Sequence, residues 1–137
     1  MSEELVQLVR RGYDAWNSGD RTWVLDHMSP EIEWITPPDD PDPGTYRGFE
    51  GVERYWGQWR AAVGQLNFEI EEMIDAGQSV VVVARRQGRG EHSGLEISDR
   101  VIQVYGFEGE TCVRVHEYYD RDAALSSIRG DRSSATP

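Results

Sequence analysis

The stretch LEISDRVIQVYGFEGETCVRVHEYYD, residues 95–120, reads as two long strands joined by a turn at Glu108-Gly109-Glu110. Apolar and polar residues alternate along both strands, which is the pattern of a half-buried β-hairpin. The alternation places Asp99, Gln103 and Glu117 on faces that also carry apolar residues. Because a small domain must bury one face of such a hairpin, polar side chains there belong either to a hydrogen-bonded network or to a pocket.

The chain before this hairpin supplies helices first and strands later. Helical spacing of apolar residues, acidic residues near helix starts and glycine stops predict helices at residues 2–17, 20–28 and 50–63. Residues 31–36 alternate as a half-buried strand does, and VVVVA within residues 79–90 indicates a strand buried on both faces. The remaining expected elements are a strand at residues 67–75 and a short final helix that starts at residue 120 or 122.

The segment PPDDPDPGTYRG, residues 37–48, holds too much proline and acid for a regular element. We expect a long loop that lies over the surface, where lids are often found. Helices, one strand, this loop, a helix and then a four-stranded meander predict an α+β domain, with the helices on one side of a curved, mostly antiparallel sheet. We expect one domain over residues 1–129 and a polar, disordered tail over residues 130–137.

The amino-acid composition excludes several classes of function for this protein. The 137 residues include 25 acidic and 14 basic side chains, and no basic stripe carries interleaved aromatics, so no nucleic-acid partner is expected. Every basic residue is arginine, which excludes a lysine Schiff base and a P-loop lysine. The N-terminal MSEELVQLVRR lacks the apolar run of a signal peptide or membrane span, which predicts a soluble, cytoplasmic protein without a membrane partner. The lone Cys112 is expected to be a buried, inert thiol.

Three motifs carry a family resemblance: GYDAWNSGD at residues 12–20, YRGFEGVERYW at residues 46–56 and VRVHEYYDRDAAL at residues 113–125. With the order of elements, they resemble the SnoaL-like branch of the nuclear transport factor 2-like superfamily, over residues 3–128. The resemblance implies a cystatin-like α+β barrel, in which a conical sheet wraps around the N-terminal helices. Members of this superfamily include ketosteroid isomerases, polyketide cyclases, limonene epoxide hydrolases, dehydratases and non-catalytic binding proteins, so the fold alone does not identify an activity.

Two catalytic patterns of the superfamily are incomplete here. Against ketosteroid isomerases, Thr36 stands where the carboxylate base belongs, Gln103 replaces the carboxylic acid of the oxyanion hole, and Tyr13 lies within one residue of its tyrosine. Against limonene epoxide hydrolases, Glu117 matches the second carboxylate. Gln87 stands in place of the aspartate of the Arg-x-Asp half, near Arg85-Arg86-Gln87.

The resemblance makes the face of Glu117 the cavity face. Burial there would raise the pKa of this carboxyl, as a general acid or base near neutral pH requires; the alternative is a structural ion pair with Arg85 or Arg100. The catalytic candidates are Glu117, Asp99, Gln103 and Tyr13, although Gln103 is equally compatible with a satisfied core amide. The ligand-binding candidates, whose aromatic members are also compatible with plain core packing, are Trp16, Trp34, Thr36, Trp56, Trp59, Arg85, His92 and Tyr119.

The three histidines show no metal-ligand spacing, and the acidic run within residues 39–42 builds no oxygen-ligand loop, so neither a metal nor another cofactor is expected. The sequence predicts a pocket for a small molecule. One hypothesis is a cofactor-independent acid/base enzyme (isomerase, cyclase, dehydratase or hydrolase) acting on an apolar cyclic compound. The other is a non-catalytic ligand-binding or dimeric interaction module. Ile102, Val104 and Tyr118 on the outer face of the sheet predict an apolar patch that a homodimer would cover.

Overall fold

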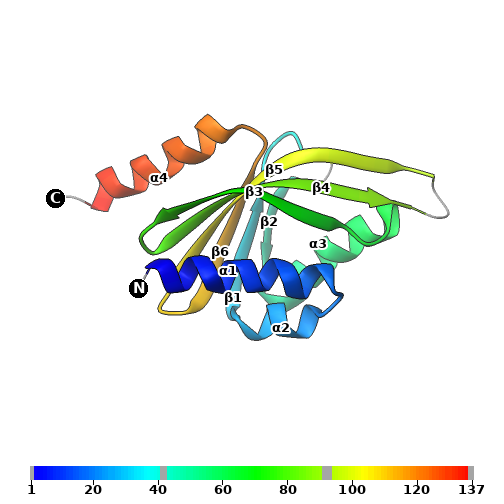
Figure 1. Cartoon of the computed structure of the whole chain (residues 1–137), viewed down its shortest axis with the longest axis horizontal. Helices are drawn as coiled ribbons and strands as arrows, with labels where there is room; N and C mark the ends of the chain where they lie inside the picture. The colour runs from blue at the N-terminus through cyan, green and yellow to red at the C-terminus, as the bar shows by residue number, and fades with distance from the viewer. Residues whose placement is uncertain (1, 41–42, 91–93, 136–137) are drawn as a thin grey trace.

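The structure is a computed structural model that describes residues 2–40, 43–90 and 94–135, with only the backbone described at residue 2 and from residue 130 onward. Its helices are α1 (Ser2–Asn17), α2 (Arg21–Asp26), α3 (Gly48–Val63) and α4 (Arg121–Ala135) (Figure 1). Its strands are β1 (Met28–Thr36), β2 (Gly44–Arg47), β3 (Asn67–Ala76), β4 (Ser79–Arg89), β5 (Glu96–Glu108) and β6 (Thr111–Tyr118). In the described part of the chain, no helix is both long and apolar enough to cross a membrane.

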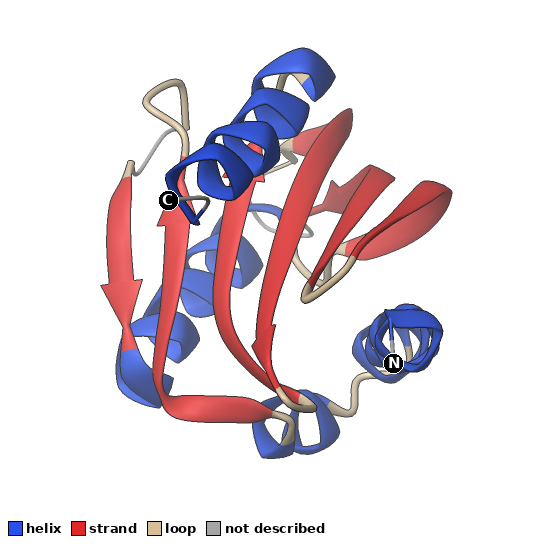
Figure 2. Ribbon diagram, turned by 90° about the vertical axis from the view of Figure 1, so that its left-hand side faces the viewer, coloured by secondary structure: helices blue, strands red, loops and turns tan. Residues whose placement is uncertain are grey.

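The strands form one sheet in the order β2-β1-β6-β5-β4-β3. Strands β3 to β6 make the predicted antiparallel meander, β1 runs parallel to β6, and β2 pairs antiparallel with β1 at the edge. The sheet curves, with α3 behind it and α4 in front of it in the view of Figure 2. The predicted α+β class with a curved, mostly antiparallel sheet is therefore confirmed.

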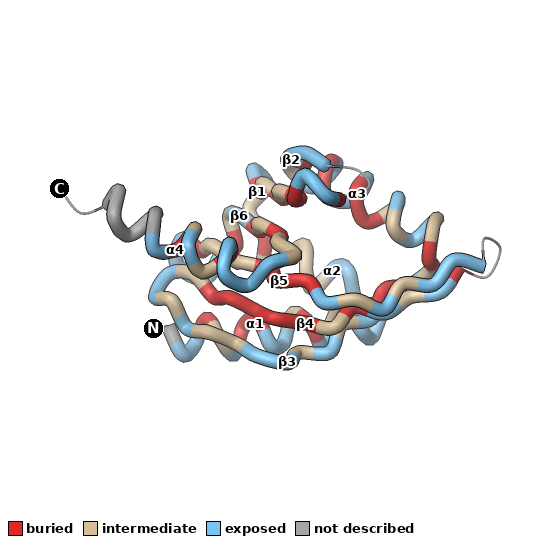
Figure 3. The backbone as a smooth tube through the Cα atoms, turned by 90° about the horizontal axis from the view of Figure 1, so that it is seen from above, coloured by how far each residue is buried: buried red, intermediate tan, exposed pale blue. Residues whose placement is uncertain are grey.

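The alternation along β4 shows how one strand serves two cores. Val80, Val82 and Ala84 face the larger core, which holds the apolar stripe of α1 and most of the buried aromatics. Val81 and Val83 face the opposite side, where they pack with residues of α4. Buried stretches of backbone consequently run along the middle of β4 and β5 (Figure 3), as the unbroken run VVVVA predicts for a central strand.

Local side-chain contacts fix the helices against this sheet. The side chain of Asp20 caps α2 by accepting a hydrogen bond from the Trp23 amide at 3.1 Å, which agrees with the expected helix start. Asn17, at the end of α1, exchanges two hydrogen bonds of 2.8 and 2.9 Å with the backbone of Phe68 on β3. These contacts hold α1 beside the sheet edge, on the side that carries the larger core.

The prediction of one continuous loop over residues 37–48 is wrong. Residues 44–47 form the edge strand β2, whose Tyr46 is buried against the ring of Tyr55 at a centroid distance of 4.7 Å. The Thr36 hydroxyl closes the turn, since its oxygen accepts from the Gly44 amide at 2.8 Å. The proline- and acid-rich composition hid this short strand, which burial of one aromatic side chain stabilises.

In the C-terminal part, α4 runs from Arg121 to Ala135, and its last residues overlap the segment expected to form the polar tail. Helix α4 lies on the outer face of the sheet and buries Ile102, which is only 2% exposed, beneath Ala124 and Ile128. Part of the apolar patch that suggested a homodimer is thus covered by the chain itself. A homodimer stays a prediction, without this patch as its reason.

Candidate active site

A cavity of about 100 Å³ lies between α1, α2, α3 and the sheet. Most of its walls are apolar and aromatic, from residues far apart in the sequence. The aromatic lining consists of Tyr13, Trp16, Trp23, Trp34, Tyr55, Trp56, Trp59, Phe68, Tyr105 and Phe107. The ionisable or amide side chains that reach it are His27, Arg60, Gln65, Arg86, Gln103 and Glu117. This is the composition of a small-molecule site with a few polar groups at fixed places.

Glu117 on β6 is the carboxyl of this cavity, and it is only 3% exposed. One carboxyl oxygen accepts a hydrogen bond from Gln103 Nε2 at 2.7 Å, and the other lies 2.7 Å from the Tyr55 hydroxyl. Burial raises the pKa of Glu117, although the hydrogen bonds from Gln103 and Tyr55 and the charge of Arg86 partly offset this rise. A buried carboxyl of this kind holds its proton to higher pH than an exposed one.

Gln103 is opposite Glu117 in the register of β5 and β6, which brings both side chains into the cavity. Its amide oxygen accepts a hydrogen bond from the Tyr13 hydroxyl and lies 2.8 Å from the Tyr105 hydroxyl. The Tyr105 hydroxyl is also 2.9 Å from that of Tyr13, and its single proton serves one of these two acceptors. These contacts orient the amide so that its NH₂ group faces Glu117. Burial raises the pKa of both phenols, so they stay neutral donors.

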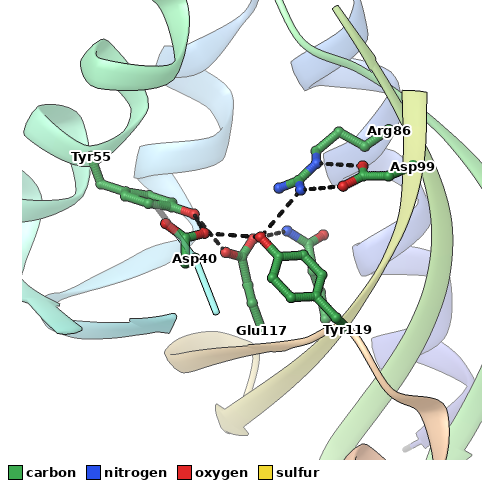
Figure 4. Close-up of polar contacts among 7 residues, drawn as sticks. Asp40, Tyr55, Arg86, Asp99, Glu117 and Tyr119 are labelled. Carbon is green, nitrogen blue, oxygen red and sulfur yellow. Dashed lines mark hydrogen bonds and ion pairs between the residues drawn. The ribbon is translucent and has the colours of Figure 1, made fainter. Parts of the chain in front are cut away.

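On the other side of Glu117, a second set of polar side chains is buried. Asp40, which follows β1 and is 4% exposed, lies 3.3 Å from the Tyr55 hydroxyl and accepts from Tyr119 at 3.1 Å. Arg86 on β4 donates to the Tyr119 hydroxyl at 3.4 Å and to both oxygens of Asp99, its partner across β5, at 3.0 and 2.8 Å. Figure 4 shows these contacts as one continuous chain from Asp99 to Glu117.

The hydrogen bonds around Tyr55 favour one protonated carboxyl, and the raised pKa of Glu117 favours Glu117 for that role. If both carboxyls are ionised, the single Tyr55 proton serves one of them, and no proton lies between Tyr55 and the other. If Glu117 is protonated, its hydroxyl donates to Tyr55, and Tyr55 donates to Asp40. Every contact in this series of hydrogen bonds then carries one proton, which agrees with the raised pKa of Glu117.

The structure brings together most of the predicted site residues. Glu117, Gln103 and Tyr13 form one network, and Tyr119 belongs to its continuation through Asp40. The four predicted tryptophans line the cavity: Trp16, Trp34, Trp56 and Trp59. Asp99 lies outside the cavity wall with its side chain 39% exposed, and it reaches the site only through Arg86.

Other predicted residues lie elsewhere. Arg85 points to the outer side of β4, where it pairs with Glu71 at 3.8 Å, and Arg100 pairs with the same carboxylate at 2.6 Å. Arg85 therefore lies outside this cavity, and neither arginine pairs with Glu117 in the described part of the structure. Thr36 is buried, but its hydroxyl bonds to the Gly44 backbone and does not line the cavity. His92 lies outside the described residues.

Arg86, Asp40, Tyr55 and Tyr105 are site residues that the sequence analysis missed. Arg86 shares the inward face of β4 with Val82 and Ala84, although the valine run before it is buried on both faces and does not itself identify the inward face. Tyr105 shares a face with Gln103 in the same way. The burial of Asp40 had no signal from strand alternation, because loop residues follow no periodicity.

Two further predictions concern the Cys112 thiol and metal binding. Cys112 is buried, and burial raises the pKa of its thiol to about 12, so the prediction of a buried Cys112 is confirmed and the nucleophilic thiolate is not formed near neutral pH. Within residues 2–40, 43–90 and 94–135, no three or more His, Cys, Asp and Glu side chains are grouped to hold a metal ion.

Comparison with known proteins places this architecture in a family. The chain is 25% identical over 124 residues to the uncharacterized protein Rv0034 of Mycobacterium tuberculosis (strain ATCC 25618 / H37Rv), covering 90% of this chain and 94% of the relative. An NTF2-like protein of unknown function from Burkholderia pseudomallei K96243 superposes with a TM-score of 0.74 at 22% identity, covering 90% of this chain and 96% of that one.

TerC co-crystallized with polyporic acid superposes with a TM-score of 0.73 at 20% identity, covering 91% of this chain and 98% of that one. At these identities the solved structures show a shared fold. A sequence profile of the SnoaL-like domain matches residues 9–115, most of the chain. The chain therefore belongs to the SnoaL-like domain family.

Proposed function

We propose that this protein is a cofactor-independent acid/base enzyme, of the isomerase, cyclase, dehydratase or hydrolase kind, that acts on a small, apolar cyclic compound. The observation that carries the proposal is Glu117: a carboxyl 3% exposed, with a raised pKa, at the wall of an apolar cavity. A carboxyl that stays protonated near neutral pH can donate a proton to a ligand oxygen.

The surrounding hydrogen bonds support both protonation states of Glu117. When the carboxyl turns its proton toward a ligand, Tyr55 can donate to the resulting carboxylate, and Gln103 Nε2 continues to donate to the other oxygen. The carboxylate can then take back a proton from the ligand or from water. Gln103 Nε2 keeps its hydrogen bond throughout, and the one change among these donors is that the Tyr55 proton turns from Asp40 to Glu117.

The cavity volume supports a ligand of about one ring. A dry apolar cavity of roughly 150 Å³ holds a benzene molecule in another protein, and the cavity here is of similar order at about 100 Å³. TerC, which shares the fold, was co-crystallized with polyporic acid. This likeness supports a cyclic ligand for the present cavity.

The test is a screen for ligands and turnover with a charge-neutral variant. Native mass spectrometry of the purified protein and a thermal-shift screen of monocyclic ketones, epoxides, phenols and quinones would identify ligands, since ligands that bind the native state stabilise it. Chromatography followed by mass spectrometry of incubated ligands would then detect products, including isomers whose mass is unchanged. We expect Glu117→Gln to bind ligand and to lose turnover, while Glu108→Gln in the exposed β5–β6 turn keeps it.

A second candidate is non-catalytic binding of the same compounds, which the small volume and the satisfied network around Glu117 favour. Pockets for drug-sized ligands measure about 300–1,000 Å³. Ligands that bind to the native protein and to Glu117→Gln alike, with no product from either, would establish this candidate and refute the enzyme.

A further inference from the structure

Two donors at the cavity have no partner among the described residues. The first is the indole N–H of Trp34, a residue 6% exposed on β1, whose nitrogen is completely buried without a hydrogen bond. It lies close enough to Glu117 to lower the pKa of that carboxyl, but it does not reach hydrogen-bond geometry. A buried unpaired donor costs stability, so it is often a position that a ligand acceptor fills.

The second donor is Arg86 Nη1. The guanidinium is 2% exposed, and its Nε and Nη2 donate to Asp99 and Tyr119, while no described residue accepts from Nη1. Figure 4 shows this nitrogen pointing away from Asp99, toward the side on which Tyr55 lies. The face of the guanidinium rests on the Trp59 ring at 4.6 Å, which fixes its plane.

Both donor side chains line the cavity together with Glu117, and both lie near enough to that carboxyl to lower its pKa. Asp99 compensates the Arg86 charge only from the outer side, where its carboxylate is 39% exposed and therefore well solvated. Asp40, the other buried carboxylate, already contacts the hydroxyls of Tyr55 and Tyr119. Arg86 Nη1 thus keeps N–H groups from which no described residue accepts a hydrogen bond, and an anionic oxygen is a suitable acceptor for them.

We infer that the ligand is a compound of about one ring with an anionic or readily ionised oxygen, such as a phenolate or enolate, which Arg86 Nη1 and Trp34 Nε1 hold beside Glu117. The inference rests on the proposed function in placing the ligand in this cavity, and it adds the charge of the ligand. The planar guanidinium and the indole are rigid donors, so they favour an oxygen in one position.

The experiment uses 4-nitrophenol, whose phenolate absorbs visible light, and nitrobenzene, which has the same ring without the ionisable oxygen. We expect the native protein to bind 4-nitrophenol as its phenolate, with the pKa of the probe lowered, and to bind nitrobenzene more weakly. Arg86→Met keeps a long apolar side chain without charge. We expect it to weaken 4-nitrophenol binding by at least about tenfold, with little change for nitrobenzene.

Trp34→Phe provides a second measurement that does not remove the Arg86–Asp99 pair, and we expect it also to weaken binding of the phenolate more than of nitrobenzene. Equal binding of both probes by the native protein, binding of the protonated phenol, or equal losses for both probes in these variants would overturn the inference. Bound phenolate without turnover of any ligand would uphold it and refute the enzyme. Turnover of a neutral compound without phenolate binding would refute the inference and uphold the enzyme.

Discussion

The raised pKa of Glu117 makes a prediction about stability that needs no substrate. Burial raises the folded-state pKa of this carboxyl above its ordinary value of 4.5. Between these two values the folded protein binds more protons than the unfolded chain, so its free energy of unfolding falls as pH rises. The stabilisation from the neutral carboxyl is complete below about pH 4.5 and is lost as pH rises through the folded-state pKa.

The substitution is Glu117→Gln, which keeps the shape of the side chain and removes its titratable carboxyl group. The glutamine oxygen can accept from Gln103 while its NH₂ group donates to Tyr55, whose proton then serves Asp40. This pattern repeats the protonated state of Glu117, so a small change at low pH is expected. As pH rises, the native protein should lose up to about 1.4 kcal/mol per pH unit relative to the variant.

The assay is urea denaturation of both proteins from pH 4 to 8, with tryptophan fluorescence as the signal that monitors unfolding. At each pH, the free energy of unfolding of the native protein is subtracted from that of Glu117→Gln. The subtraction cancels the titrations that the two proteins share. We expect the difference to rise with pH above about 4.5 and then to level off, while the same difference for Glu108→Gln stays flat. A difference that is flat or falls for Glu117→Gln would refute the raised pKa and the acid role built on it.

Three other changes test the packing of the site and the fold. Gln103→Leu leaves the hydroxyl groups of Tyr13 and Tyr105 and one oxygen of Glu117 without this partner, so we expect a loss of about 2–4 kcal/mol in denaturant titrations; the exposed Gln58→Leu is the control. Gly64→Ala places a Cβ 2.8 Å from the Arg89 carbonyl oxygen at φ +70°, whereas Gly109→Ala meets nothing at φ +60°. We expect the first to lower Tm more, by an added cost of about 1–3 kcal/mol, and equal Tm values would contradict the close approach. Removal of residues 121–137 uncovers Ile102, so light scattering should show larger species than for the whole chain; an unchanged mass per particle would argue against α4 as a cover.

Sequence patterns predicted the fold well because its elements carry strong local signals. The helices have apolar stripes with stops such as Gly64, and β4 to β6 have long alternating or fully apolar runs. The edge strand β2 was missed because four residues after a proline-rich segment carry almost no periodicity. Its stability comes from Tyr46 packing on Tyr55, which only the folded chain brings together.

The site was predictable in part where one strand pair defines it. The alternation along β5 and β6 puts Gln103 and Glu117 on faces that also carry apolar residues, but their direct pairing also depends on a register shift between Gly106 and Phe107, which the turn at residues 108–110 does not predict. The position of Arg86 could not be predicted in the same way. The valine run before it is buried on both faces, so the sequence does not show which face of β4 Arg85 or Arg86 occupies. Only the pairing of β4 with β5 sets Arg86 opposite Asp99.

Asp40 shows why the loop matters to the chemistry even though no sequence signal marks it. Its carboxylate is buried beside two phenols, one of which also contacts Glu117 and the other of which accepts from Arg86. Tyr55 has one proton and lies between the two carboxyls, so Asp40 and Glu117 compete for it. The acidic loop that composition alone assigns to the surface therefore contributes a carboxyl to the hydrogen bonds of the site, and the proposed acid role of Glu117 is linked to that carboxyl through Tyr55.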